Sequence, residues 1–275
     1  MEVTVLRATE NPERLVCQAA RGDYYQGYVG DTEYADLMEN VNYSDDDLEN
    51  LPVMTYRNNA AMLEQMNIEI SAYQAEDSFL SRDTKLAAKT RSFIEKQLSR
   101  GHFGPWEHPQ ITFAIKGVPV FTERQLIRHR HLTFDVQSMR YADFSDAPYT
   151  VPKSMTDPEH FSRERGLSEI SDADREAARE LYEEEMDRSF EKYQELLDRG
   201  IPKEDARGLL GLSTEVNLTV SGNARTFLHL LDMRRKANAQ RNIRELSEAM
   251  LDELFEWMPY TFNYYAENGP NKLSP

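Results

Sequence analysis

The chain has 275 residues, 40% of them hydrophobic, which predicts one large globular domain with its own core. Its 48 acidic and 32 basic residues give a net charge of −16, which disfavours binding to nucleic acid or to an anionic membrane surface. The lone Cys17 excludes an internal disulfide, no apolar run approaches the roughly 20 residues of a membrane helix, and no signal-peptide pattern opens the chain. We therefore expect a cytoplasmic protein that spans no membrane.

The basic residues are strongly biased toward arginine, with 9 Lys against 23 Arg. A strongly acidic, lysine-poor surface is typical of a protein that stays soluble in high salt, where screening removes self-repulsion. The sequence therefore favours a halophilic source, and an ordinary acidic enzyme is the alternative.

The first 80 residues have the weakest pattern. Residues 44–50 (SDDDLEN) are typical of an acidic loop or of a helix start, and residues 58–67 of a short helix. A clearer helix is predicted over 84–99, where apolar residues recur at helical spacing and Gly101 follows as a C-terminal stop.

The middle of the chain predicts a strand and two helices. Residues 111–115 (ITFAI) alternate as a strand does, and Pro119 can open the next helix. Residues 171–199 predict a long amphipathic helix with Ser171 as its N-cap. Its apolar stripe consists of Met186, Phe190, Tyr193 and Leu197.

The last third predicts another strand and two more helices. Residues 216–220 alternate, and Asn223 is a good N-cap for a helix whose stripe continues onto Arg234. An arginine on a core-facing stripe either reaches out to solvent or meets a ligand. A further stripe over 243–254 runs to Pro259. Helices mixed with a few strands predict an α+β fold: one domain, 1–275, with long helices and a mixed or antiparallel sheet.

Two segments are cationic within this acidic chain. Residues 117–141 and 221–244 together carry ten basic residues against three acidic ones. Because the arginine fork matches phosphate and carboxylate oxygens, a buried ligand with several negative charges explains both segments. The alternative is that these arginines pair with acidic residues elsewhere on the surface.

Common catalytic signatures are absent from the sequence. It contains no GxxxxGK[ST], no GxGxxG after a strand, no HExxH, no paired CxxC and no GxSxG. We therefore predict no metal site. Cys17 is a candidate nucleophile on paper, but a lone cysteine is more often a small buried apolar residue.

One segment is distinctive: residues 128–141 read RHRHLTFDVQSMRY. It resembles the signature of the flavin-dependent thymidylate synthases, RHRxxSxNxxSxRY, with Thr133 and Asp135 in place of Ser and Asn. Four other segments match the family in order: 101–108 (GHxxxxEH), Arg124-Gln125, 200–207 (GxPxxxAR), and Asn223-Ala224-Arg225 followed by Arg234 and Ala239-Gln240. The resemblance covers about 84–265. The N-terminal 80 residues diverge, and Ala20-Arg21-Gly22-Asp23 stands where the family has ARVS.

The resemblance implies an activity and a set of ligands. Members of this family methylate dUMP to dTMP with methylenetetrahydrofolate as carbon donor and with FAD, reduced by NADPH, as hydride source. They are homotetramers whose active sites are built from several subunits. They bind FAD without a Rossmann fingerprint and need no cysteine nucleophile, which suits this sequence.

The resemblance also implies a role for individual residues. The residues expected to contact FAD are Arg128, His129, Arg130, Asn223, Arg225 and His229. The residues expected to hold dUMP are Gln125, Ser138, Met139, Arg140, Arg207 and Arg234. Arg140 and Arg207 suit the phosphate, and Arg234 the uracil ring, where a fixed cation stabilises developing negative charge. His102 is expected near flavin and folate, so the catalytic candidates are Arg234, Ser138 and His102. Ser138 lacks an evident base and is assigned to binding.

Four positions depart from the family pattern. They are Val136, where a Glu or Gln is frequent, His229 for Asn, Asn238 for His, and Gly211 for Pro. Gln137, the next residue, could supply the polar group that Val136 does not. The arginine framework is intact, so an active enzyme is the leading hypothesis. A non-catalytic flavin- or nucleotide-binding homologue is the second, and an RNA-binding regulator, disfavoured by the net charge, is the third.

Overall fold

The computed structural model describes residues 1–49, 82–157 and 170–268, so the helix expected over 58–67 lies outside the described residues. The chain divides into two compact units. Unit 1 consists of Met1–Thr4, Phe113–Ser221 and Lys236–Leu246, and unit 2 of Val5–Thr112, Gly222–Arg235 and Ser247–Pro275. The expectation of one catalytic domain over 1–275 stays a prediction.

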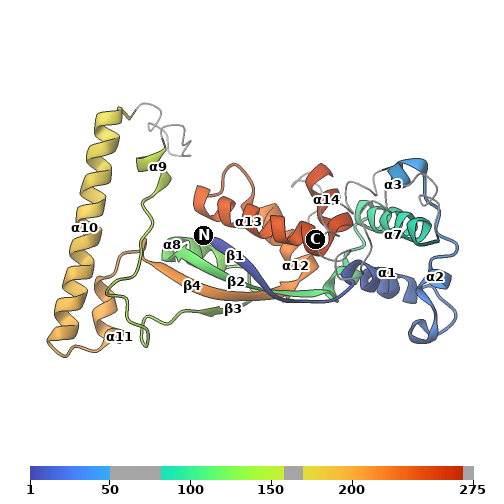
Figure 1. The fold of residues 1–275 in the computed structure, drawn as a ribbon, viewed down its shortest axis with the longest axis horizontal. Coiled ribbons are helices and arrows are strands. Elements are labelled where there is room, and N and C mark those ends of the chain that lie inside the picture. The colour runs from blue at the N-terminus through green and yellow to red at the C-terminus, as the bar shows by residue number, and fades with distance from the viewer. Residues whose placement is uncertain (50–81, 158–169, 269–275) are drawn as a thin grey trace, which may run out of the picture. The chain divides into compact units, whose positions relative to one another are not determined.

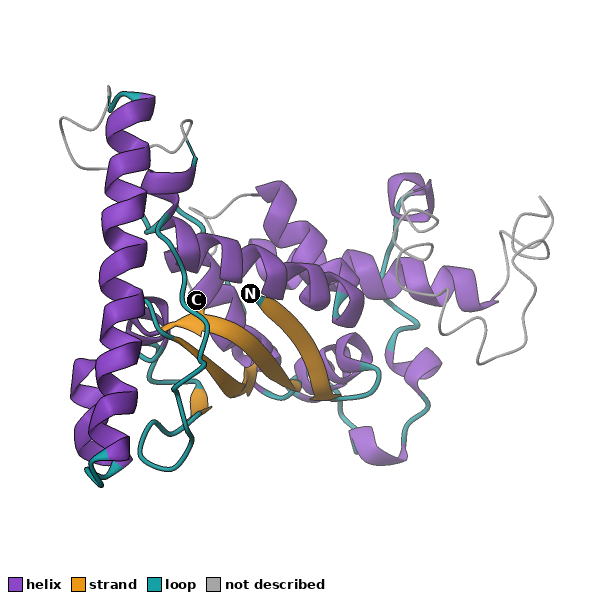
Figure 2. Ribbon diagram, turned by 60° about the vertical axis from the view of Figure 1, so that its left-hand side comes forward, coloured by secondary structure: helices purple, strands orange, loops and turns teal. Residues whose placement is uncertain are grey.

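The strands form a four-stranded sheet in the order β1 (Glu2–Ala8), β2 (Gln110–Pro119), β4 (Glu215–Asn223), β3 (Thr133–Val136). Figure 2 shows them as twisted orange ribbons. β3 pairs antiparallel with β4, with Thr133 opposite Ser221 and Val136 opposite Leu218. The apolar residues of β2 and β4 that alternate in the sequence are buried, which confirms both predicted strands.

Unit 1 contains α8 (Val120–Leu126), α9 (Lys153–Thr156), α10 (Asp172–Asp198), α11 (Lys203–Ala206) and the 3₁₀ turn η4 (Arg207–Leu209). The predicted N-cap of α10 is confirmed, because Ser171 Oγ accepts a hydrogen bond from Asp174 N at 3.1 Å. α9 and α11 contact α10, one near each end (Figure 1).

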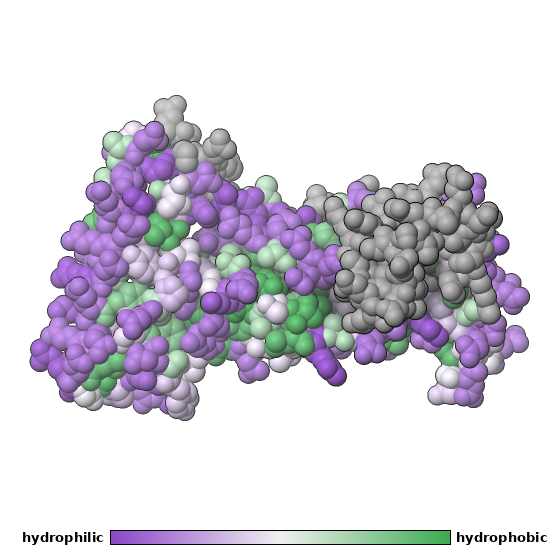
Figure 3. All heavy atoms as spheres, in the orientation of Figure 1, coloured by the Kyte–Doolittle hydropathy of each residue, from purple (hydrophilic) through white to green (hydrophobic). Residues whose placement is uncertain are grey.

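The long helix α10 is amphipathic, as its sequence predicts. Met186, Phe190 and Tyr193 are buried on one stripe. Tyr193 packs with Phe144, Ala206 and Val216 in a core cluster. The outer surface of the helix is mostly hydrophilic (Figure 3). The helix therefore supports the loop that follows β3 and the start of α11.

Unit 2 contains α1 (Pro12–Gly22), the 3₁₀ turn η1 (Val29–Asp31), α2 (Tyr34–Leu37), α3 (Asp45–Glu49), α7 (Arg82–Ser99), η3 (Gly104–Glu107), α12 (Ala224–Arg234) and α14 (Pro259–Asn268). α7 begins two residues before the predicted start and ends as predicted, before Gly101 at φ 76°. It packs against α1, α3 and α14, and η3 packs against α1 and α12. η3 thus joins the first helix to the helix that carries the second cationic segment.

The C-terminal helices follow their predicted stripes. α12 is capped by Asn223, whose Oδ1 accepts a hydrogen bond from Thr226 N at 2.9 Å. The buried stripe of α13 (Arg241–Trp257) contains Ile243, Leu246, Met250 and Leu254. The expected stop at Pro259 is the first residue of α14, which suits the missing N–H of proline. With these helices and the sheet, the predicted α+β fold is confirmed.

Cys17 is fully buried on α1. Burial, the largest cause, raises the pKa of its thiol to about 12, so the thiol stays protonated at neutral pH. This residue is a packing residue. Within residues 1–49, 82–157 and 170–268, no helix has the length and apolar character needed to cross a membrane.

Candidate functional site

The predicted site residues divide between the two units. Unit 1 holds Gln125, Arg128, His129, Arg130, Ser138, Met139, Arg140 and Arg207, and unit 2 holds His102, Asn223, Arg225, His229 and Arg234.

The RHR segment forms a tight turn between α8 and β3. His129 N donates to Leu126 O at 3.1 Å, and Leu132 N donates to His129 O at 3.0 Å. His129 is buried, whereas Arg128 and Arg130 are exposed on either side of it. Neither arginine forms an ion pair with another described residue. The turn therefore presents two guanidinium groups that an anionic ligand can bind.

Ser138 begins the turn after β3. Its carbonyl accepts hydrogen bonds from Tyr141 N at 3.2 Å and Ala142 N at 2.9 Å, and its hydroxyl oxygen accepts one from Arg140 N at 3.3 Å. The half-buried Met139 packs against the core cluster around Phe144. Ser138 thus organises the turn that carries Arg140, and its predicted role in binding stays a prediction.

Arg140 and Arg207 meet at one residue, Glu204. Arg140 Nε and Nη2 both donate to Glu204 Oε2, at 2.9 and 2.6 Å. Arg207 Nε donates to the backbone carbonyl of Glu204 at 3.1 Å. The Arg140 guanidinium also lies over the Tyr141 ring, 5.5 Å from its centroid. The structure therefore brings the two predicted phosphate ligands to the same place, although they are far apart in sequence.

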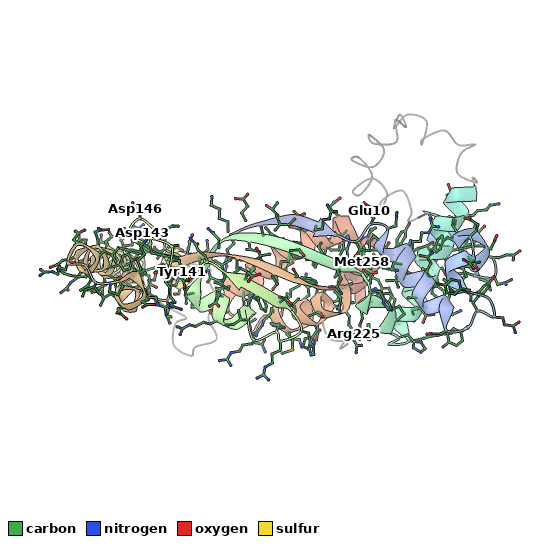
Figure 4. All side chains as sticks on the ribbon, turned by 90° about the horizontal axis from the view of Figure 1, so that it is seen from below. Glu10, Tyr141, Asp143, Asp146, Arg225 and Met258 are labelled. Atoms are coloured by element: carbon green, nitrogen blue, oxygen red, sulfur yellow. The ribbon has the colours of Figure 1, made fainter. Side chains whose placement is uncertain are left out.

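Lys203 ties α11 to the loop after β3. Its Nζ lies 3.8 Å from Asp143 Oδ2 and donates to the Tyr141 carbonyl at 3.4 Å. Hydrogen bonds from the Ser145 hydroxyl and backbone N–H lower the pKa of Asp143, so this carboxylate is charged. Figure 4 labels Tyr141, Asp143 and Asp146 on this loop, beside α10. These contacts of Lys203 hold α11 close to the loop that carries Arg140.

Gln125 links two of the matching segments. Its Nε2 donates to the side-chain oxygen of Gln240 and, at 3.2 Å, to Phe121 O. The Arg-Gln pair before the signature therefore contacts the Ala-Gln pair that follows α12 in sequence.

In unit 2, His102 and Arg225 line one open pocket with a volume of about 300 Å³. Eight further residues line it: Ala20, Asp23, Tyr24, Gln97, Gly101, Phe103, Gly104 and Pro105. A Cβ built on Gly104 would meet no atom within 4 Å, so this part of the wall is open. Asp23, Tyr24 and Gln97 were not predicted from the sequence. The one signal was the replacement of ARVS by Ala20-Arg21-Gly22-Asp23, at the end of α1.

Arg225 is held by Glu107 of η3 through an ion pair. The backbone joins the same two segments, because Ala224 N donates to Pro109 O at 3.1 Å. η3 is itself anchored by Trp106, whose Nε1 donates to Thr261 Oγ1 at 3.0 Å in the buried core. The GHxxxxEH and NAR segments are thus in direct contact through a side-chain ion pair and a backbone hydrogen bond.

Asn223, His229 and Arg234 occupy different positions on α12. The Asn223 side-chain oxygen is used as the helix cap, and its amide N–H₂ group has no hydrogen-bond partner among the described residues. Arg225 and His229 are four residues apart and share a face. Arg234 is nine residues from Arg225, which places it about 180° around a helix of 3.6 residues per turn. The two arginines of one chain therefore point away from each other on α12.

Arg234 is half-buried at the end of α12, while Phe227, Leu230 and Leu231 on its stripe are fully buried. Burial lowers the pKa of its guanidinium, but an arginine remains charged at neutral pH. The cation is thus held partly out of water at the edge of the core, where its charge acts through a lower local dielectric.

Other arginines of the second cationic segment pair with acidic residues. Arg235 Nε lies 2.8 Å from Glu248 Oε1, and Arg241 contacts Asp157 and, at 2.8 Å, Glu245. For these two residues the surface-pairing interpretation is correct, because carboxylates already satisfy their charge.

The structure explains one departure from the family pattern, Gly211, and shows how Gln137, the neighbour of Val136, uses its side chain. Gln137 N donates to Asn217 O at 2.8 Å, and its side-chain oxygen accepts from Asn217 N at 3.1 Å, so its amide extends the pairing of β3 with β4. A Cβ on Gly211 would lie 2.8 Å from Met186 Sδ, so glycine at this position gives Met186 of α10 its space. Val136 is exposed on β3.

Residues 4–260 match the family model described as thymidylate synthase complementing protein. The chain belongs to this family. Two relatives named flavin-dependent thymidylate synthase, from Halobacterium salinarum and Haloarcula marismortui, are 38% and 37% identical to it, and the alignments cover all of both chains.

The fold also matches solved structures. The UMP/dUMP methylase PolB from Streptomyces cacaoi bound with 5-Br dUMP is 22% identical with a TM-score of 0.68, over 99% of this chain and 97% of that one. The same methylase bound with 5-Br UMP is 30% identical with a TM-score of 0.58, over 68% and 84%.

Proposed function

We propose that this chain is a flavin-dependent thymidylate synthase. It converts dUMP, methylenetetrahydrofolate and reduced FAD into dTMP, tetrahydrofolate and oxidised FAD. The observation that carries the proposal is the meeting of Arg140 and Arg207 at Glu204, in a chain that aligns over its whole length with enzymes of that name. NADPH is the reductant that we assign to the flavin.

Arg140 and Arg207 bind the phosphate of dUMP. A guanidinium presents two parallel N–H groups, which match two phosphate oxygens in a charge-assisted pair. Ser138 and Gln125 lie on the same unit and supply hydroxyl and amide groups for the rest of the nucleotide. Met139, whose side chain packs inward, contributes through its backbone.

The residues present fit a flavin nucleotide. Arg128 and Arg130 are exposed cations without an ion-pair partner among the described residues, and the unit 2 pocket combines Arg225 and His102 with the open wall at Gly104. We assign Arg128, His129, Arg130, Asn223, Arg225 and His229 to FAD. When bound and reduced, FAD supplies the hydride that completes the methyl group. His102, which lines the same pocket as Arg225, would contact FAD and the folate.

Arg234 stabilises negative charge on the uracil carbonyl. Its half-buried guanidinium stays protonated, and a fixed cation in a site of low dielectric stabilises a developing oxyanion without reorganisation. The residue holds its charge and transfers no proton.

The active enzyme is a homotetramer whose subunits share each site. The support is the position of Arg225 and Arg234 on opposite faces of α12. A flavin bound by Arg225 and a uracil bound by Arg234 would lie on different faces of the helix. The two residues of one chain therefore belong to different active sites, and each site needs residues from another subunit. The acidic composition, with a net charge of −16, and the halophilic relatives support a cytoplasm of high salt.

The visible absorption spectrum of the protein purified in KCl tests the proposal. We expect a bound flavin that NADPH bleaches faster when dUMP is present, followed by dUMP-dependent NADPH oxidation once methylenetetrahydrofolate is added. Flavin binding without dTMP formation would instead identify the non-catalytic homologue. A protein that neither co-purifies with flavin nor binds added FAD contradicts the proposal.

A further inference from the structure

The Glu204 carboxylate is bound to the guanidinium of Arg140, the group that the proposed function assigns to the phosphate of the substrate. Its Oε2 accepts both Arg140 Nε and Arg140 Nη2, the two donors that form the fork. A phosphate therefore cannot take this fork until the Glu204 carboxylate moves away.

The structure fixes Glu204 close to Arg140 but leaves its side chain room to move. Arg140 lies over the Tyr141 ring, and Lys203 ties α11 to the loop that carries both residues. The side chains of Arg140 and Glu204 are 51% and 47% exposed, so the carboxylate can rotate into water. Glu204 is thus an anion held near Arg140 at a high effective concentration by the chain itself.

We propose that Glu204 is a displaceable internal anion that competes with phosphate for Arg140 and lowers the affinity of the site for every ligand that carries a phosphate. This inference rests on the proposed function. Inorganic phosphate and dUMP must both displace the Glu204 carboxylate before either can use the Arg140 fork. dUMP also gains contacts to its sugar and base, so it displaces Glu204 and orders Arg140 around its own phosphate.

The size of the effect follows from the exposure of the ion pair. A competitor of this kind weakens every phosphate ligand by about 1.5- to 5-fold, the range that exposed ion pairs give. It leaves deoxyuridine, which has no phosphate, unaffected. Because salt screens the pair, the effect shrinks as KCl rises, with a Debye length of about 3 Å at 1 M.

The test is calorimetric titration of the FAD-loaded protein with dUMP, deoxyuridine and inorganic phosphate, at high KCl and at the lowest KCl concentration that leaves its circular dichroism unchanged. The variants are Glu204→Gln, Glu204→Asp, whose shortened carboxylate keeps the charge but draws back from Arg140, and the control Asp205→Asn. Asp205 is the exposed neighbour on α11 and has no side-chain partner among the described residues. Glu204→Gln and Asp205→Asn change the net charge equally.

We expect Glu204→Gln and, less strongly, Glu204→Asp to bind dUMP and inorganic phosphate about 1.5- to 5-fold more tightly than wild type at the lower of the two KCl concentrations, with Asp205→Asn unchanged. Equal affinities in Glu204→Gln and Asp205→Asn overturn the inference, since the gain is then a charge effect or absent. Weaker dUMP binding in Glu204→Gln also overturns it, because Glu204 is then a positioning residue for Arg140. Wild-type protein that binds dUMP no better than deoxyuridine contradicts the proposed phosphate site itself.

Discussion

Glu107 and Arg225 form an ion pair that joins the turn η3 to the start of α12. The pair stands beside the pocket that Arg225 and His102 line. Arg225 is labelled in Figure 4, at the beginning of α12. Glu107 restricts the arginine to one orientation before any ligand arrives, and two of the family segments are thereby joined by one side-chain contact.

Replacing Glu107 by Gln is expected to weaken FAD binding by about 1.5- to 5-fold, because Arg225 is then no longer oriented by a carboxylate. Quenching of flavin fluorescence on titration measures the affinity. The control is Glu185→Gln, which removes a comparable exposed pair with Arg188 on α10. Tighter FAD binding in Glu107→Gln would show that the carboxylate competes with the flavin instead of orienting its ligand.

Replacing Arg234 by Ala is expected to abolish dUMP-dependent NADPH oxidation while FAD stays bound. The variant has no cation to stabilise the uracil oxyanion, and the loss of one such group costs roughly 10²- to 10³-fold in rate. The flavin absorption spectrum of the purified variant and its circular dichroism show that cofactor and fold persist. Turnover near the wild-type rate would show that Arg234 does not stabilise the uracil.

Tyr24 and Tyr28 offer a matched pair of exposed tyrosines. They are 73% and 75% exposed, but only Tyr24 lines the unit 2 pocket. Tyr24→Ala is expected to weaken flavin or folate binding several-fold, because a ring at the wall of a pocket stacks on a planar ligand. Tyr28→Ala should bind both as wild type does. Equal losses in the two variants would indicate a general effect on the loop.

Glu13 makes stability depend on pH. It is buried on α1 and accepts a hydrogen bond from Thr261 N at 2.8 Å, and burial raises its pKa from 4.5 to about 8. Because the folded-state pKa is the higher one, the folded chain holds this proton more tightly than the unfolded chain. The stabilisation is complete below the unfolded pKa and is lost as pH rises toward 8, at up to ~1.4 kcal/mol per pH unit.

Glu13→Gln is therefore expected to flatten the decline of the melting temperature between pH 5 and pH 8, since the amide accepts the same bond without titrating. Thermal unfolding followed by circular dichroism across this range measures it. Glu10→Gln, an exposed change two residues before α1, is the control. A slope as steep in Glu13→Gln as in wild type would assign the pH dependence to other groups.

Lowering the salt is expected to unfold the protein, because the net charge of −16 repels itself when screening is removed. Acidic residues are dense on exposed helices such as α3 and α10. Circular dichroism during stepwise removal of KCl follows the loss of helix. An unchanged spectrum from high to low salt would mean that the acidic surface has no such role.

The correct predictions of the fold came from elements with a strong apolar periodicity and a recognisable cap. The helix α10, the capped helix α12 and the strands β2 and β4 were predictable because each combines an apolar period with a local start or stop signal. β1 and β3 were not predicted. β3 has four residues and is mostly exposed, so its pairing with β4 rather than its own pattern makes it a strand.

The sequence by itself determined the types of residue at the site. The signature around RHR and SxRY, the cationic segments and the N-cap at Asn223 are all local, and local patterns are readable without the fold. Tertiary structure alone decided which charges meet. It placed Arg140 on Glu204, Arg225 on Glu107 and Arg241 on Asp157, across separations of up to 118 residues. Such pairings depend on how distant elements pack, and charge by itself does not specify a partner in an acidic chain with many carboxylates.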